Sequence, residues 1–264
     1  MQDNQEVKIL EYRYQSLTHV GKVRTMNEDA LIESPATHLF GVCDGMGGHA
    51  AGEVASSLAA SAFKRVMAKN TQSSAIALRK AIRQAEERIC RDQTFYPEHQ
   101  GMGTTLSAFL LSGPKPEEGW VIHVGDSRVY RCRMQHLEQL TSDHSPTFRL
   151  YQEGLLSKEQ ARAHPKKHVL DQALGLNPPA QTDVFAVDVQ ERDLFLLCTD
   201  GLSDQLGDSE IQDICRDTPF SDLAQHLVDS ANAKGGLDNV SVILIEILPT
   251  DEQLIRKSRS FDED

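Results

Sequence analysis

Residues 194–204 read LFLLCTDGLSD, an apolar run that ends in an aspartate and a glycine turn. A run as apolar as LFLLC is typical of a buried strand, so Asp200 stands where the chain leaves the core. Three more aspartates border apolar runs: Asp44 in LFGVCDGMGGH, Asp126 in WVIHVGDSRVY and Asp238 in GLDNVSVILIEI. Carboxylates gathered at the edge of a core would repel one another unless cations neutralise them. The sequence therefore predicts one metal site built from four distant segments.

The composition is that of a folded, acidic protein. The chain has 264 residues, of which 39% are hydrophobic, enough for a substantial core. Its formal net charge of −12 argues against sequence-independent binding to nucleic acid or anionic lipid. No apolar stretch reaches the ~18 residues that span a bilayer, and the start MQDNQEVK lacks the features of a signal peptide. We therefore expect a cytoplasmic protein without a nucleic-acid or membrane partner.

Strands and helices follow one another in blocks rather than in strict alternation. The first half predicts strands over 12–21, 29–34 and 38–44, amphipathic helices over 52–69 and 74–91, and an antiparallel meander over 104–134. The second half predicts two strands within 185–200, helices over 209–216 and 221–232, and a closing strand over 239–248.

The chain contains no internal repeat and no Gly-, Pro- or Ser-rich linker that would divide it. Residues 1–249 are therefore expected to form a single domain. Within it, the polar segment at about 142–179, with one predicted short helix over 158–164, is expected to be a flap-like insertion beside the site. The polar tail 250–264 has too few apolar residues to join a core.

The expected metal ligands are oxygen atoms. Five cysteines without Cys-x-x-Cys spacing argue against zinc, whereas carboxylates suit Mg²⁺ or Mn²⁺. Glycines adjoin three of the aspartates and permit tight turns there: Gly45, Gly125 and Gly201. A single Asp-Gly pair is usually only a turn, but its recurrence at the ends of apolar runs indicates a site.

Arg24, in VRTMNED, is a candidate ligand for a phosphate group. A guanidinium is planar and permanently charged, so it can hold two phosphate oxygens while neighbouring carboxylates hold a metal. An isolated arginine is more often a surface charge or a salt-bridge partner. The acidic residues that follow it, Glu28 and Asp29, favour the first interpretation.

The motifs together resemble the metal-dependent protein serine/threonine phosphatases of the PPM, or type 2C, family, and in particular its compact bacterial members. RTMNED, VCDGMGGHAAGE, GMGTT, HVGDSRVYR, LTSDHS, QEGLLSKEQARAHP, HVLDQALG, CTDGLSD and GLDNVSV occur in the family's order over residues 12–247. The resemblance implies an α+β fold: a four-layer αββα sandwich of two stacked antiparallel β-sheets flanked by helices, with metals at one edge.

The resemblance also implies an activity, the hydrolysis of phosphoserine and phosphothreonine in proteins. The expected partners are phosphoprotein substrates and a cognate Ser/Thr kinase whose action the enzyme reverses, and the expected state is a monomer. Two Mn²⁺ or Mg²⁺ ions are implied at the core of the site. One is held by Asp44, Asp200 and Asp238, and the other by Asp44, the carbonyl of Gly45 and Asp29.

The implied metal site has one alternative ligand and one additional position. Glu28, the neighbour of Asp29, is the alternative acidic ligand from the same motif. Many bacterial members hold a third, weaker ion through the residue that matches Asp126, together with Asp200 and Asp204.

In the implied mechanism the two core ions lower the pKa of a shared water, and the hydroxide attacks phosphorus without a phosphoenzyme. Arg24 binds the substrate phosphate and stabilises charge on its oxygens. Many eukaryotic relatives carry a histidine, proposed as the general acid, directly after the first Asp-Gly, but Met46 stands there in this chain. His49, His144 and a metal-bound water near Asp126 are other candidates, and for each histidine a structural role is the stronger interpretation.

Two other classes of function remain alternatives. A metal-dependent nuclease or phosphodiesterase is disfavoured by the acidic composition and by the lack of a basic stretch with interleaved aromatic residues. An inactive phosphoprotein-binding scaffold is disfavoured because every expected metal aspartate and Arg24 are present. The sequence identifies neither the cognate substrate nor the metal used in the cell.

Overall fold

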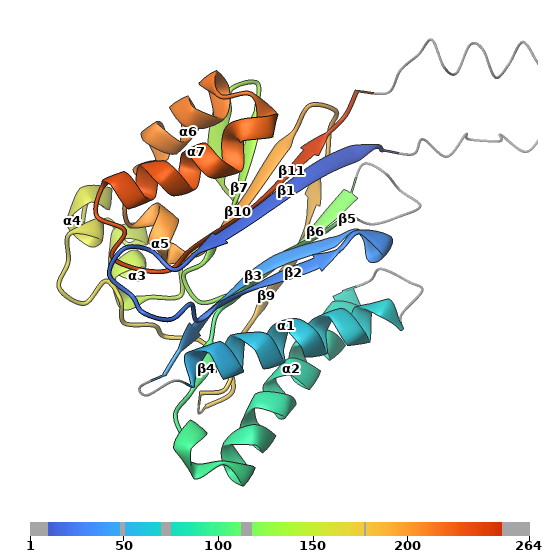
Figure 1. Cartoon of the computed structure of the whole chain (residues 1–264), viewed down its shortest axis with the longest axis vertical. Coiled ribbons are helices and arrows are strands. Elements are labelled where there is room, and N and C mark those ends of the chain that lie inside the picture. The colour runs from blue at the N-terminus through green and yellow to red at the C-terminus, as the bar shows by residue number, and fades with distance from the viewer. Residues whose placement is uncertain (1–9, 48–50, 70–74, 112–117, 177, 250–264) are drawn as a thin grey trace, which may run out of the picture.

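A computed structural model describes residues 10–47, 51–69, 75–111, 118–176 and 178–249. Of the residues named above, the start MQDNQEVK, His49, residues 74 and 177 and the tail 250–264 lie outside these ranges. Two antiparallel sheets are stacked on each other, and helices cover both outer faces (Figure 1). The expected four-layer αββα sandwich is therefore confirmed.

Each sheet is antiparallel throughout. The first has the order β1 (Tyr12–His19), β11 (Val240–Ile247), β10 (Leu194–Cys198), β7 (Arg128–Arg133) and β8 (His136–Gln139). The second has the order β2 (Asp29–Ser34), β3 (Leu39–Met46), β5 (Leu106–Leu111), β6 (Glu118–Val124) and β9 (Asp183–Asp188), with the short β4 (Gly103–Thr104) paired to β3.

The long helices pack in pairs on opposite sides of the sandwich (Figure 1). The second sheet is covered by α1 (Gly52–Ala68) and α2 (Ala75–Phe95), and the first by α6 (Asp208–Asp217) and α7 (Phe220–Ala233). Three short helices, α3 (Pro146–Gln152), α4 (Lys158–Arg162) and α5 (Asp200–Ser203), gather at one end of the sandwich. Single 3₁₀ turns occur at Pro35–Thr37 and Pro97–His99.

Successive side chains of a strand point to opposite faces of its sheet, so the two sheets contribute to three apolar layers: one between them and one under each pair of helices. In β11, Val240, Val242 and Leu244 pack with the helices α6 and α7. The intervening residues, Ile243 and Ile245, pack between the two sheets. Almost the whole of β11 is thus buried on both faces, which explains its continuous apolar run.

The same alternation delivers two acidic side chains to the space between the sheets. In β3, Phe40 and Val42 face the other sheet, and Asp44 lies two residues further on the same face. In β2, Leu31 faces the other sheet and Asp29 precedes it by two residues. Both carboxylates therefore lie where the inter-sheet layer ends.

The structure contains elements that the sequence patterns did not predict. β8 follows a turn in which Met134 and Gln135 both have positive φ, a hairpin conformation that usually takes Asn and Gly. The helices α3 and α5 were also not expected, and α2 continues to Phe95, past its expected end at residue 91. In the described ranges no helix has the length and apolarity needed to cross a membrane.

Candidate metal centre

Asp29 and Asp44 lie directly opposite each other in the register of β2 and β3. Like charges in this position destabilise a sheet unless something neutralises them. The backbone N–H of Asp44 donates to Thr105 Oγ1 at 2.9 Å, which fixes the end of β3. Burial raises the pKa of Asp44 well above its ordinary value, and repulsion from Asp200 and Asp29 raises it further.

The two oxygens of Asp29 have different surroundings. Its Oδ2 accepts hydrogen bonds from Thr199 Oγ1 at 3.0 Å and from Ser241 Oγ at 2.6 Å, both from the first sheet's side of the sandwich. Its Oδ1 is buried and has no hydrogen-bond partner among the described atoms. Burial raises the pKa of Asp29 to about 7. One oxygen is thus fixed and the other is available to a cation.

Glu28 lies beside the first turn of α1 and the Gly45 carbonyl. A Cβ on Gly52 would lie 2.5 Å from Glu28 Oε1, so this carboxylate rests against the first turn of α1. Burial raises the pKa of Glu28. Gly45 is needed in the same place, because a Cβ there would lie 2.1 Å from the Gly52 carbonyl oxygen. The chain thus brings the backbones at residues 28, 45 and 52 into close contact.

Arg24 and Asp238 meet at the rim of the site. Arg24 Nη2 donates to Asp238 Oδ2 at 2.8 Å, and the arginine side chain is 49% exposed. Their loops are tied together, since Asn239 Nδ2 donates to the carbonyls of Val20 and Met26. The guanidinium therefore lies beside the carboxylates and still faces solvent.

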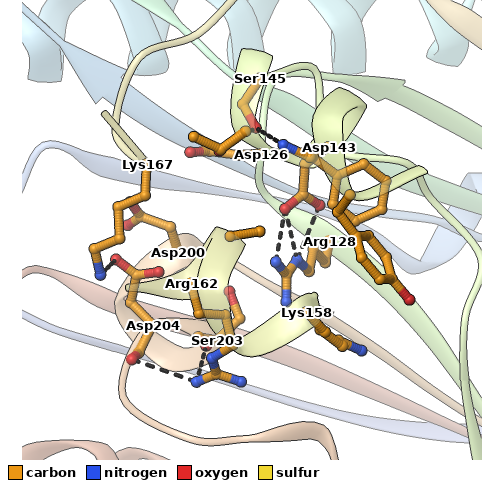
Figure 2. A pocket seen from close by; sticks show the side chains of 14 residues that line it. Asp126, Arg128, Asp143, Ser145, Lys158, Arg162, Lys167, Asp200, Ser203 and Asp204 are labelled. Carbon is orange, nitrogen blue, oxygen red and sulfur yellow. Dashed lines mark hydrogen bonds and ion pairs between the residues drawn. The ribbon is translucent and has the colours of Figure 1, made fainter. Parts of the chain in front are cut away.

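Asp200 also belongs to a second cluster of acidic side chains, together with Asp126 and Asp204. Burial raises the pKa of Asp200 well above its ordinary value, and Asp126 and Asp204 repel it. Burial also raises the pKa of Asp126 to about 7. These three aspartates line a small pocket of about 40 Å³, around which Figure 2 shows the basic side chains of Arg128, Lys158, Arg162 and Lys167.

The segment expected to be a flap, at about 142–179, contributes basic side chains to the lining of this pocket. Arg162 Nη2 donates to the carbonyls of Ser203 at 3.0 Å and Leu206 at 3.1 Å, and so holds α4 on the end of α5. Lys167 Nζ lies 2.7 Å from Asp204 Oδ2. The short helices at the end of the sandwich thus cover this acidic cluster.

His144 has the contacts of a structural residue. Its backbone N–H donates to the Gly125 carbonyl at 2.7 Å, and its Nδ1 accepts from the Gly125 N–H at 3.2 Å. Its Nε2 lies 3.2 Å from Asp183. These bonds hold the start of the flap against the turn before Asp126.

The structure brings together the aspartates that sequence reasoning selected, and it adds groups that reasoning missed. The hydroxyls of Thr199 and Ser241, which orient Asp29, carry no motif of their own. Their signal is positional, because each lies on the strand face that continues toward Asp29. Lys167 gave no signal, since its contact with Asp204 depends on how the flap folds.

The donor set fits hard divalent cations. It consists of carboxylate oxygens, one of them buried without a partner, and burial makes their ionised forms unfavourable without a positive charge. We found among the described residues one group of His, Cys, Asp or Glu whose ligand atoms already lie close enough to share an ion: His168, Asp200 and Asp204. The arrangement therefore suits metal-assisted chemistry beside a phosphate-binding arginine.

Comparison with known proteins agrees with this geometry. The family profile described as Protein phosphatase 2C matches residues 19–244. The serine/threonine phosphatase stp of Listeria welshimeri is 37% identical over 238 residues, which cover 87% of this chain and 93% of that protein. The crystal structure of the Mycobacterium tuberculosis serine/threonine phosphatase PstP/Ppp superposes with a TM-score of 0.83 at 32% identity, covering 91% of this chain and 100% of that one.

A further solved structure bears on the cations. The catalytic domain of PstP in complex with two manganese ions has a TM-score of 0.82 and 32% identity, over 91% of this chain and 100% of that one. An αββα sandwich whose edge gathers buried carboxylates defines a class of metal-dependent enzyme. This chain belongs to the protein phosphatase 2C family.

Proposed function

We propose that this protein is a metal-dependent phosphatase that hydrolyses phosphoserine and phosphothreonine in proteins. The observation that carries the proposal is the convergence of Asp29, Asp44 and Asp200 at one edge of the sandwich, next to the exposed guanidinium of Arg24. The family and the phosphatases to which the chain is similar support the same activity. A cognate Ser/Thr kinase would supply its substrates.

The proposed ligands of the core cations are divided as the family pattern implies. Asp44, Asp200 and Asp238 would hold one ion, and Asp44, the Gly45 carbonyl and Asp29 the other. The partnerless Oδ1 of Asp29 supports Asp29 as the acidic ligand. Glu28 stays the alternative, because its Oε1 and the Gly45 carbonyl oxygen lie 2.5 and 2.9 Å from the same point, the position that a Cβ on Gly52 would take. Asp126, Asp200 and Asp204 would hold a third, weaker ion. Bound Mn²⁺ or Mg²⁺ supplies a water of low pKa and neutralises charge on the phosphate.

The protein's own groups bind and orient the substrate. Arg24 would donate to two oxygens of the phosphate, and Asp238 limits its motion through the 2.8 Å contact. Thr199 and Ser241 hold Asp29 in one orientation. Phosphoryl transfer depends mainly on positioning and electrostatic stabilisation, so these contacts account for the roles that the chain must fill.

Attack without a phosphoenzyme is supported by the state of the nearest thiols. Cys43 adjoins Asp44, and Cys198 precedes Asp200 by two residues. Both are buried, and burial raises their pKa values, that of Cys198 to about 12. They remain protonated and enclosed, which makes them poor nucleophiles. Met46 carries no exchangeable proton, so the proton for the leaving oxygen has another source.

We further propose that residues 1–249 act as one domain and one catalytic unit, a monomer in the cytoplasm. All five cysteines are free, as expected in a reducing compartment. The inter-sheet layer is built from side chains of both sheets, which supports a single folding unit.

The test is a comparison of substrates with the full-length protein. We expect phosphate release from a phosphothreonine peptide in Mn²⁺, abolished by a chelator and restored by added metal. Single-stranded DNA incubated in the same buffer should remain intact. Cleavage of DNA without peptide hydrolysis would indicate a nuclease, and peptide binding without hydrolysis would indicate a scaffold; either result contradicts the proposal.

A further inference from the structure

Two consecutive flap residues approach the same oxygen of Asp204. Lys167 Nζ lies 2.7 Å from Asp204 Oδ2, and His168 Nδ1 lies 3.7 Å from it. Both belong to the turn at 165–168 that follows α4. Figure 2 shows the lysine reaching across the pocket toward Asp204, with Asp200 close by.

The ammonium of Lys167 already acts as a cation at this position. Asp204 stands beside Asp200 and Asp126, each of which raises the local negative potential. The lysine side chain is 28% exposed and the Asp204 side chain 27%, so their ion pair is partly shielded from solvent. A divalent ion bound to Asp204 Oδ2 would lie within a few Å of the ammonium and be repelled by it, so the binding of that ion favours the departure of Lys167.

The imidazole of His168 is placed to take part once the ammonium leaves. One ligand atom from each of His168, Asp200 and Asp204 can be chosen so that all lie within 4.8 Å of one another. In an octahedral shell with bonds of about 2.1 Å, donor atoms are separated by about 3.0 to 4.2 Å. The histidine side chain is 64% exposed, so the ring can turn inward without disturbing the core.

We propose that the flap offers Asp204 two alternative partners. Without a third divalent cation, Lys167 neutralises Asp204. When that cation binds, Lys167 leaves and His168 joins Asp200 and Asp204 as a nitrogen ligand. The exchange needs only the turn at 165–168 to move, because the contacts of Arg162 with the Ser203 and Leu206 carbonyls hold α4 separately. This inference rests on the proposed function for the existence of the third cation.

The inferred ligand has a consequence for metal choice. Imidazole nitrogen binds transition-metal ions better than Mg²⁺, which prefers oxygen ligands and water. The core positions, built from oxygen donors, should accept both metals. The third position should therefore favour Mn²⁺ over Mg²⁺ more strongly than the core does, and this preference should depend on His168.

The first experiment tests the competition with Lys167. Mn²⁺ binding to the full-length protein is measured by calorimetry for wild type, for Lys167→Met and for the matched control Lys166→Met, whose lysine is exposed. Removal of the competing ammonium should tighten the weakest Mn²⁺ site roughly three- to tenfold. The control should bind as wild type does. An unchanged weakest site in Lys167→Met overturns the competition.

The second experiment tests the nitrogen ligand. Pulsed electron paramagnetic resonance of the Mn²⁺-loaded protein should reveal nitrogen hyperfine coupling in wild type and in the control His136→Asn, an exposed histidine on β8. The coupling should be lost in His168→Asn. Its absence from wild type, or its persistence in His168→Asn, overturns the assignment. Phosphopeptide hydrolysis is measured on the same samples, so a failed ligand assignment in an active enzyme is distinguished from failure of the proposed function.

Discussion

Asp29 illustrates how one side chain is prepared for a cation. Its two oxygens are made unequal by Thr199 and Ser241, which occupy one and leave the other without a partner. A cation at the free oxygen would meet a carboxylate that is already fixed in orientation, so little conformational freedom is lost on binding. The hydroxyls are thus as much a part of the proposed centre as the carboxylates.

Replacing Ser241 by alanine tests this role. The change removes the 2.6 Å hydrogen bond and leaves both oxygens of Asp29 less constrained. We expect the Mn²⁺ concentration for half-maximal activity to rise roughly 10- to 100-fold, with a smaller change at saturating Mn²⁺. Ser221→Ala, at an exposed position at the start of α7, is the control. Identical Mn²⁺ dependence in Ser241→Ala and wild type would show that the hydroxyl does not support the site.

The sequence predicts the identity of the site residues better than the orientation of their side chains. Asp44, Asp126, Asp200 and Asp238 are identifiable because each borders an apolar run. Asp29 is identified only through the resemblance to the family, because the apolar run that follows it is too short. The period of two also places Asp29 and Leu31 on one strand face and Glu28 on the other. Which of those faces meets the second sheet depends on the packing of the whole sandwich. The partnership of Lys167 and Asp204 is likewise a property of the folded flap.

At the scale of elements, the base of the flap is fastened to β7 by a buried ion pair. Arg128 Nε and Nη2 donate to the two oxygens of Asp143, at 2.9 and 2.6 Å. The side chains are 11% and 8% exposed. Such a pair is costly to break, because removal of one partner leaves the other charge buried without compensation.

Arg128→Met should therefore destabilise the protein by about 3 to 5 kcal/mol, since Asp143 would lose its buried partner. Urea denaturation followed by circular dichroism measures the effect. Arg216→Met is the matched control, because that arginine pairs with Asp213 and Asp217 on the exposed surface of α6, and its loss should change stability little. Equal stability of the two variants would rule out a structural role for the buried pair.

The elements that were predicted and those that were missed differ in their local signals. The strand β11 has a continuous apolar run and the helices α1 and α7 have an amphipathic pattern, and the structure has each within two residues of its expected bounds. The helix α3 was missed inside a polar segment, although Ser145 caps it and Pro146 begins it, a pairing that favours a helix start. The helix α5 has four residues, too few for any periodicity.

At the scale of the whole molecule, one buried histidine ties the sandwich to the flap. His123 Nδ1 lies 2.8 Å from Ser107 Oγ, and its Nε2 lies 3.0 Å from the Ser142 carbonyl oxygen. Burial, together with the smaller effect of the neighbouring His144, lowers the pKa of His123 to about 3. The folded protein therefore holds the neutral ring over a wide range of pH.

This burial gives a signed dependence of stability on pH. The unfolded chain binds a proton at His123 near pH 6.5 and the folded protein only near pH 3, so the contribution is complete above pH 6.5. As the pH falls from 6.5 toward 3, the contribution of His123 to the free energy of unfolding decreases by about 1.4 kcal/mol per pH unit. In His123→Gln this slope should be absent, so the stability gap between wild type and variant should narrow on acidification. A gap that stays constant between pH 7 and about 5 would contradict the buried neutral ring.

The central claim is that the buried aspartates hold the cations on which phosphate hydrolysis depends. The most direct test is Mn²⁺-dependent phosphate release from a phosphothreonine peptide by wild type, Asp200→Asn and Asp126→Asn. Asp200 is proposed to serve a core ion, whereas Asp126 is proposed to serve only the third. We predict near-complete loss of activity in Asp200→Asn at every Mn²⁺ concentration, and a smaller loss in Asp126→Asn that added Mn²⁺ reduces. Full activity in both variants would contradict the account.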